Sequence, residues 1–182
     1  MNSTDAGSVD AHDSNRIVSL SAAILAVLAA LGTLFAHHRS ISALSVKNQA
    51  ILAQSRASDS YNAYEAKQIR YNIYQALLAG QIVTNSQSRA RLESVAQRER
   101  TTSPAVLEKA RNLEDQAARD DDRSESFLRS YERLQFAATA FQIAIVFVSI
   151  SALAAARFLL PAGFVLGALG MVLFVTGLLQ AR

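Results

Sequence analysis

Cysteine is absent from the 182 residues, which excludes disulfides, thiolate metal sites and a cysteine nucleophile. Only two prolines and seven glycines occur, and this scarcity argues against a sandwich or barrel with many turns. Charged residues make up 18% of the chain, compared with about 25% in typical soluble domains. The net charge of +3 is too small to indicate a nucleic-acid-binding protein, and the length predicts one domain.

Three long windows contain no Asp, Glu, Lys or Arg and consist mainly of Ala, Leu, Ile, Val and Phe, at residues 17–38, 134–156 and 158–181. A helix rises about 1.5 Å per residue, so about 20 residues cross a hydrocarbon core of about 30 Å. Backbone groups in lipid must be satisfied internally, and each window therefore predicts a transmembrane helix. A buried helix of a soluble protein could explain one such window, but not three.

The predicted fold class is all-α, an integral membrane protein with three transmembrane helices and a long, water-exposed, coiled-coil-like helical hairpin. The predicted segments are a disordered polar leader at 1–16, a first span at 17–36, a soluble hairpin domain at 37–135 with helices at about 38–79, 89–100 and 104–135, a second span at 136–156 and a third at 161–180. The leader carries acidic residues and no basic residue before Arg16, unlike a secretory signal peptide. Gly80 predicts a helix end, and Ser103 followed by Pro104 predicts a helix start.

The clearest constellation in the hairpin is a group of tyrosines around one lysine: Tyr61, Tyr64, Lys67, Tyr71 and Tyr74. Tyr64, Lys67 and Tyr71 share a helix face because they are separated by three and four residues. Such a lysine can make cation–π contacts or act as a nucleophile when desolvated. The competing interpretation, which we favour, is a packing seam between helices, because the spacing places no second catalytic group beside the lysine.

Apolar and small residues also recur with a four-three spacing along both long helical segments of the hairpin. In the second of these segments the pattern is interrupted at Asp120 and Ser124. Neither seam is strongly apolar, and a lone hairpin buries little surface. We therefore expect partner helices from other subunits.

Glycines line one face of the last predicted span, at Gly163, Gly167, Gly170 and Gly177. Faces of small residues let helices approach closely in lipid. The expected partner of this face is the first span or another subunit.

Other candidate sites are weak. Asp120, Asp121 and Asp122 are consecutive, so on a helix their side chains point about 100° apart and cannot enclose one ion. His37 and His38 have only His12 as a further histidine, which favours membrane-interface anchoring over metal binding. No phosphate-binding loop or nucleophile motif is present. We expect no catalytic residues, no cofactor, no metal, no nucleic-acid partner and no identified small-molecule substrate.

The block from Ala50 to Arg70 resembles a segment shared by a bacterial membrane-protein family known only as domain of unknown function 4337. The stretch Phe141–Ile145, with Ser149 and Leu153, and the glycine-bearing last span are similar to the same family. The order of one membrane helix, a charged helical region and two further membrane helices covers nearly the whole chain. The resemblance implies membership but no activity.

These patterns predict a non-enzymatic, membrane-anchored helical scaffold or interaction protein. Its expected partners are the lipid bilayer and either further copies of the chain or other subunits of a larger membrane complex. An alternative is a pore-forming or transport component of an oligomeric assembly. Basic residues flank the hairpin side of the predicted spans, which places the hairpin and the C-terminus in the cytoplasm of a bacterial inner membrane.

Overall fold

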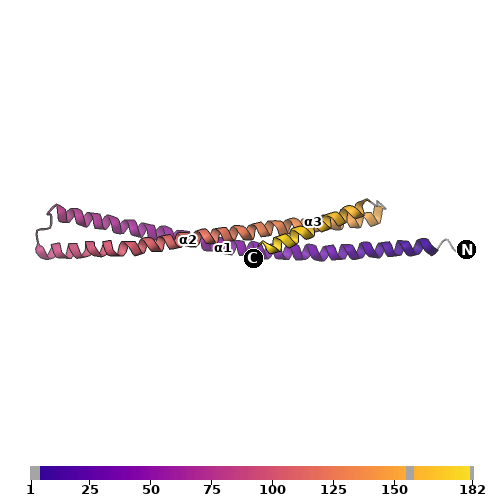
Figure 1. Cartoon of the computed structure of the whole chain (residues 1–182), viewed down its shortest axis with the longest axis horizontal. Helices are drawn as coiled ribbons and strands as arrows, with labels where there is room; N and C mark the ends of the chain where they lie inside the picture. The colour runs from indigo at the N-terminus through magenta and orange to yellow at the C-terminus, as the bar shows by residue number, and fades with distance from the viewer. Residues whose placement is uncertain (1–4, 155–157, 181–182) are drawn as a thin grey trace. The chain divides into compact units, whose positions relative to one another are not determined.

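The computed structural model describes residues 5–154 and 158–180, with side chains at 16–151 and 158–180. These residues form three α-helices and no β-strand: α1 (Asp5–Ala79), α2 (Ser86–Ala154) and α3 (Leu159–Leu179) (Figure 1). The prediction of an all-α fold is confirmed. Each of the three helices contains a stretch that is long and apolar enough to cross a membrane.

The contacts divide the chain into two compact units, although the length predicts one domain. The first, here called the hairpin unit, is Ser45–Arg123. The second, the apolar unit, comprises Met1–Leu44 and Ser124–Arg182. In a long helix each residue contacts only the residues near it, so distant parts of the same helix can belong to separate sets of contacts.

The hairpin unit turns between α1 and α2 at residues 80–85 (Figure 1). Gly80 donates its backbone N–H to the Ala76 carbonyl at 2.9 Å, which closes the last turn of α1. The left-handed backbone that often ends a helix falls on Gln81, with φ 53°, and not on Gly80. Asn85 caps α2, because its Oδ1 accepts the backbone N–H groups of Gln87 at 2.9 Å and Ser88 at 3.4 Å.

Helix α2 continues through Pro104, so the predicted separate helices at 89–100 and 104–135 are one helix. Ser103 does not act as an N-cap; its buried hydroxyl donates to the Glu99 carbonyl at 2.8 Å within the helix. Proline in a helix interior costs about 3 kcal/mol relative to alanine. The buried residues Ala96 and Ala110 on either side of it show that the packing of the hairpin unit continues across Pro104.

Residues 5–16 belong to α1, although the sequence predicts a disordered leader at 1–16; residues 1–4 of that prediction lie outside the described residues. Extending an existing helix needs no new nucleus, so the long helix that follows favours helical backbone in the leader.

Alanine forms the centre of the hairpin unit. On α1 the residues Ala50, Ala53 and Ala57 are buried, and on α2 so are Ala110 and Ala117. These positions are separated by three, four or seven residues, the repeat that keeps one face of a helix against its neighbour. Small side chains give close contact between the helices but bury little apolar area, so pairs of longer polar side chains carry more of the specificity.

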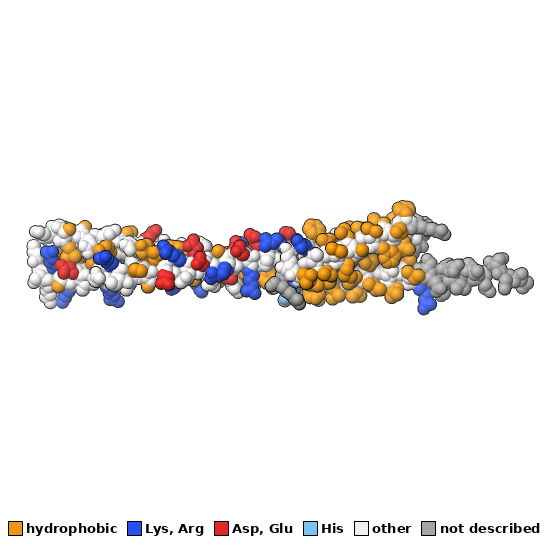
Figure 2. All heavy atoms as spheres, viewed as in Figure 1, with side chains coloured by type: hydrophobic (Ala, Val, Ile, Leu, Met, Phe, Trp, Pro, Cys, Tyr) orange, Lys and Arg blue, Asp and Glu red, His pale blue; other side chains and the backbone are white. Residues whose placement is uncertain are grey.

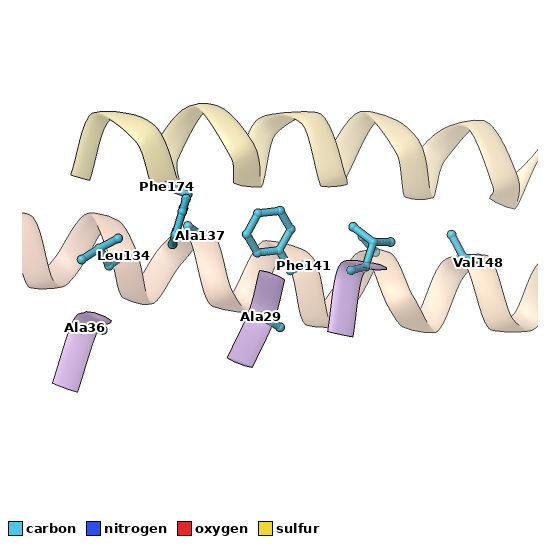
Figure 3. Close-up of a cluster of buried hydrophobic side chains, with 9 residues drawn as sticks. Ala29, Ala36, Leu134, Ala137, Phe141, Val148 and Phe174 are labelled. Atoms are coloured by element: carbon cyan, nitrogen blue, oxygen red, sulfur yellow. The ribbon is translucent and has the colours of Figure 1, made fainter. Parts of the chain in front are cut away.

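The apolar unit has a core of aliphatic and aromatic side chains from all three helices, and hydrophobic side chains also cover its visible surface (Figure 2). Phe141 extends from α2 toward α3 (Figure 3). The Phe174 ring meets the rings of Phe35 and Phe141 edge-on, with centroid distances of 6.1 Å and 6.5 Å. The cluster consists of Leu25, Ala29, Ala36, Leu134, Ala137, Phe141, Ala144, Val148 and Phe174.

Candidate functional site

The five residues of the tyrosine–lysine group all lie on α1 within the hairpin unit, and all are half-buried. Tyr64 and Tyr71 continue the seven-residue repeat of Ala50 and Ala57. The face that carries small residues in the first half of the hairpin therefore carries large ones in the second half. The group is Tyr61, Tyr64, Lys67, Tyr71 and Tyr74.

Lys67 reaches across the hairpin to α2. Its Nζ donates to Glu99 Oε2 at 3.1 Å and to Thr102 Oγ1 at 2.8 Å. The Lys67 side chain is 21% exposed and that of Glu99 is 16% exposed, so water screens this ion pair less than a surface pair. Arg70 approaches the other carboxylate oxygen, with Nε 3.4 Å from Glu99 Oε1. One carboxylate therefore joins two cations of α1 to α2.

These contacts set the ionisation of Glu99. The hydrogen bond from Lys67 lowers the pKa of Glu99, and the charges of Arg70 and Lys67 act in the same direction. Desolvation opposes the shift but does not reverse it. Glu99 is therefore held as a carboxylate, the form that the cluster needs for packing.

The Lys67 amine is engaged in contacts with α2 within the hairpin unit. A lysine nucleophile needs a free amine with its lone pair directed at a substrate. Here Nζ donates to a carboxylate and to a hydroxyl, and both acceptors belong to the neighbouring helix. The arrangement matches the seam interpretation, in which Lys67 fixes the register of the two helices.

Two further polar pairs join the hairpin helices nearer its base. The Tyr61 hydroxyl donates to Glu114 Oε2 at 2.6 Å, and this hydrogen bond raises the pKa of Tyr61. Lys47 forms an ion pair with Asp121. Asp121 belongs to the acidic run at 120–122, so one member of this run pairs across the hairpin. Among the described residues, no group of three or more His, Cys, Asp or Glu side chains could hold a metal ion.

The glycines of α3 face two different helices of the apolar unit. A Cβ atom on Gly163 would lie 2.8 Å from Val148 Cγ2, and one on Gly170 would lie 2.9 Å from Phe141 Cε1. Gly167 instead approaches Leu25 of α1, at 3.1 Å from its Cδ2. The sequence predicts the first span or another subunit as partner, but the structure adds α2, which receives Gly163 and Gly170. The physical reason is connectivity, because α3 follows α2 directly in the chain and consecutive elements usually pack as neighbours.

Sequence reasoning missed several residues that complete these contacts. Glu99 and Thr102 are the partners of Lys67, and Glu114 is the partner of Tyr61. Charged and hydroxyl residues are frequent throughout the hairpin, so no local signal distinguishes these three. A folded hairpin with a known register would have been needed to find them.

Two buried serines were also missed as packing residues. Ser124 donates to the Ala43 carbonyl at 3.0 Å, and Ser130 donates to the Gly177 carbonyl at 2.6 Å. The sequence pattern treats Ser124 as a break in the seam, whereas its side chain is buried within it. A hydroxyl that bonds a backbone carbonyl of a neighbouring helix fits a close helix–helix contact as well as alanine does.

Comparison with known proteins gives a single result. A family model described as domain of unknown function (DUF4337) matches residues 14–180, which is nearly the whole chain. No curated protein and no solved structure matches the chain. The match covers the candidate lysine cluster in the hairpin unit and the glycine face of α3 alike, and the chain therefore belongs to the DUF4337 family.

Proposed function

We propose that the chain is a non-enzymatic, membrane-anchored helical scaffold that holds its hairpin in water and self-assembles in the bilayer. In this proposal the apolar parts of α1, α2 and α3 cross the membrane. Helix α3 has 21 residues, a length of about 31 Å at 1.5 Å per residue, which fits a hydrocarbon core of about 30 Å. Only the first part of α1 and the last part of α2 would lie in lipid.

The observation that supports a non-enzymatic role is that the polar side chains of the candidate site bind one another between the two helices. Lys67, Glu99 and Thr102 bind one another across the hairpin, and Tyr61 binds Glu114. A catalytic site directs such groups toward a substrate position. Here they are directed at the neighbouring helix, where they set the register and hold the hairpin closed.

The surface of the apolar unit supports the membrane proposal. Phe136, Val165 and Val172 are each at least 60% exposed. Exposed apolar surface of this density is costly in water and favourable in lipid. Near the end of the uncharged window, the Arg39 guanidinium lies 5.6 Å from the centroid of the Phe127 ring, an arrangement that suits the membrane–water boundary.

Self-assembly is supported by Gln142. This amide lies on α2 inside the uncharged window 134–156, and its side chain is exposed in the single chain. An amide facing hydrocarbon is unfavourable, and glutamine in lipid characteristically hydrogen-bonds to another helix. A second copy of the chain would supply such a helix.

The location in the proposal is the bacterial inner membrane, with the hairpin and the C-terminus in the cytoplasm. Its support is the distribution of basic residues near the uncharged windows. Arg39, Lys47, Arg129 and Arg133 lie on the hairpin side, whereas Arg16 and Arg157 lie on the other side. Cytoplasmic loops carry the excess of Lys and Arg in membrane proteins.

Site-directed labelling tests the membrane arrangement, and the absence of native cysteine makes it clean. Ile82→Cys places a thiol at the hairpin tip, and Phe158→Cys places one at the turn before α3; both side chains are exposed. A membrane-impermeant maleimide is applied to right-side-out and inverted vesicles. We expect Ile82→Cys to react only in inverted vesicles and Phe158→Cys only in right-side-out vesicles.

Two results would contradict the membrane arrangement. Labelling of both thiols from the same side would contradict the single membrane crossing proposed between them. Release of the protein from membranes by an alkaline wash would show that no helix of the chain spans the bilayer. If Ile82→Cys reacts only in right-side-out vesicles and Phe158→Cys only in inverted vesicles, the membrane anchor is supported and only the proposed orientation is wrong.

A further inference from the structure

The two helices of the hairpin unit have very different outward faces. Each helix has fourteen positions opposite the packing seam, within residues 45–76 of α1 and 91–122 of α2. On α1 two of them are charged, both acidic, at Asp59 and Glu65. On α2 seven are charged, and they are Arg91, Arg98, Glu108, Arg111, Asp115, Arg119 and Asp122.

Large apolar side chains show the opposite distribution. Four lie at the outward positions of α1, and none lies at those of α2. All four are at least half exposed: Ile51 58%, Leu52 56%, Ile69 58% and Ile73 51%. The outward face of α2 has the composition of a solvated helix, whereas that of α1 has the composition of a face that another helix covers.

We infer that the outward face of α1 is the surface through which the hairpins of two copies of this chain pair in parallel. The inference rests on the proposed function, because the bilayer gives every copy the same orientation. The face is here called the outer stripe. It consists of the uncharged residues Asn48, Ile51, Leu52, Ser55, Asn62, Ala66, Ile69, Ile73 and Ala76.

The outer stripe, from Asn48 to Ala76, is about 42 Å long at 1.5 Å per residue, and a helix is about 10 Å wide. A face of this size contributes about 420 Å² per copy and about 840 Å² for a pair. This is the area of a small interface, below the roughly 1,200–2,000 Å² of stable complexes, so the pairing also depends on the common orientation that the bilayer gives every copy.

Charge also favours a second copy over a charged partner. A twofold axis parallel to the helices brings each stripe residue opposite itself, and like charges would then repel. The outer stripe is uncharged, so this pairing is allowed. Asp59 lines the same surface hollow as Arg56 and Lys109, so two cations of its own copy lie near this carboxylate.

Glu65 and Arg70 add complementarity at the edge of the stripe. In a parallel pair of helices, a flanking residue faces the residue five positions later on the partner, and ion pairs at such positions select the partner and its orientation. Glu65 is exposed, and the Arg70 side chain is 48% exposed, so each can meet its counterpart on the second copy. Asn48 and Asn62 would lie near the centre, where asparagine specifies register in parallel helix pairs.

Single-cysteine crosslinking of the full-length chain in liposomes tests this surface. Asn62→Cys, Ile69→Cys and Ala76→Cys are separated by seven residues along the stripe, and Asn112→Cys on the outward face of α2 is the control. All four parent residues are exposed. We expect oxidation to link each stripe variant to its own copy, because disulfides need Cα atoms within about 7 Å. The control should remain a single chain.

A charge variant tests the same surface without oxidation. Ile69→Lys combined with Ile73→Lys should reduce the assembly to a smaller mass in mild detergent, while Asn112→Lys should leave the mass unchanged. Circular dichroism checks that all variants keep their helix content, which is expected because both isoleucines are exposed. Loss of the assembly in both the stripe variant and the control would contradict the inference.

The remaining outcomes separate this inference from the proposed function. If the protein is anchored and multimeric but no stripe cysteine links to its copy, the scaffold stands and the outer stripe is wrong. Crosslinking at only one stripe position would indicate crossing or antiparallel hairpins and would also overturn parallel pairing. If Ile69→Cys links instead to a different polypeptide in native membranes, the partner is another protein. If the vesicle labelling contradicts the membrane arrangement, the proposed function itself is wrong.

Discussion

Lys67 Nζ lies 3.1 Å from Glu99 Oε2, although 32 positions separate the two residues in the sequence. The contact joins α1 and α2 in the outer half of the hairpin unit. In the inner half the helices meet through alanines, which pack closely but hardly discriminate one register from another. The charged pair therefore determines which residues face each other.

The first prediction concerns the Lys67–Glu99 pair. Lys67→Met should destabilise the hairpin, because it leaves the Glu99 carboxylate, which is 16% exposed, with one cation fewer. Glu99→Gln should also destabilise it, and the double variant should lose less than the two single losses combined. Hydrogen exchange of the hairpin amides, measured by mass spectrometry on the full chain in detergent, gives these local stabilities.

Strict additivity of the two substitutions would contradict the account of the pair. A matched control is Lys109→Met with Glu108→Gln on α2, where both side chains are exposed. These substitutions should change hairpin exchange only slightly, since exposed charges contribute little to stability.

The second prediction is a pH dependence of hairpin stability. The pKa of Glu99 is lower in the folded protein than its ordinary value of 4.5, so the unfolded state binds the proton more readily. The stabilisation is complete above that ordinary value and is lost as the pH falls through the lowered pKa. Hydrogen exchange in the outer half of the hairpin, corrected for intrinsic rates, should accelerate as the pH falls through this range. A Glu99→Gln protein with the same acid dependence as the wild type would show that another group is responsible.

The third prediction concerns the glycine face of α3. Gly170→Ala should destabilise the apolar unit by about 1–3 kcal/mol, because the added Cβ would lie 2.9 Å from the buried Phe141 ring. Gly163→Ala should behave similarly, since its Cβ would lie 2.8 Å from Val148 Cγ2 and 3.2 Å from the Ala144 carbonyl oxygen. Thermal unfolding of the apolar unit in detergent measures both effects.

Gly167→Ala is the matched control for the glycine face. Among the described residues, its only close neighbour is the end of the Leu25 side chain at 3.1 Å, which can move. The gain in helix propensity from glycine to alanine, about 1 kcal/mol, should offset most of the crowding. Equal losses at positions 163, 167 and 170 would show that the close approach of α2 is not the cause.

The fourth prediction concerns the hairpin turn. Gln81 has φ 53°, a left-handed conformation that costs a side-chain-bearing residue about 1–2 kcal/mol. Gln81→Gly should therefore stabilise the hairpin by about 0.5–1 kcal/mol, whereas Gln81→Ala should give no gain. Amide exchange at the end of α1 and the start of α2 reports the change. A stabilising Gln81→Ala would indicate that the glutamine side chain, and not the backbone, is unfavourable.

The sequence predicts much of the architecture because hydrophobicity and helix breakers act locally. The absence of charge at 17–38, 134–156 and 158–181 indicates the three apolar stretches, and Gly80 indicates the turn. Pro104 is misleading because its helix-breaking effect is local, whereas the packing that continues on both sides of it, at the buried Ala96 and Ala110, depends on the neighbouring helix.

The candidate site was harder to predict than the helices. The spacing of Tyr64, Lys67 and Tyr71 places them on one face, but it cannot identify Glu99 or Thr102 on the other helix. Partner choice depends on the register of the two helices, which contacts between residues distant in the sequence determine. For the same reason, the approach of Gly163 and Gly170 to α2 became visible only in the folded chain.

The most direct test of the self-assembling scaffold is the mass of the full-length protein in mild detergent, measured by light scattering and corrected for bound detergent. The account predicts a defined multiple of the single-chain mass that persists on dilution in the range where the protein remains folded. A single-chain mass at every protein concentration would contradict it, since Gln142 and the outer stripe of α1 would then lack the second copy on which the account depends.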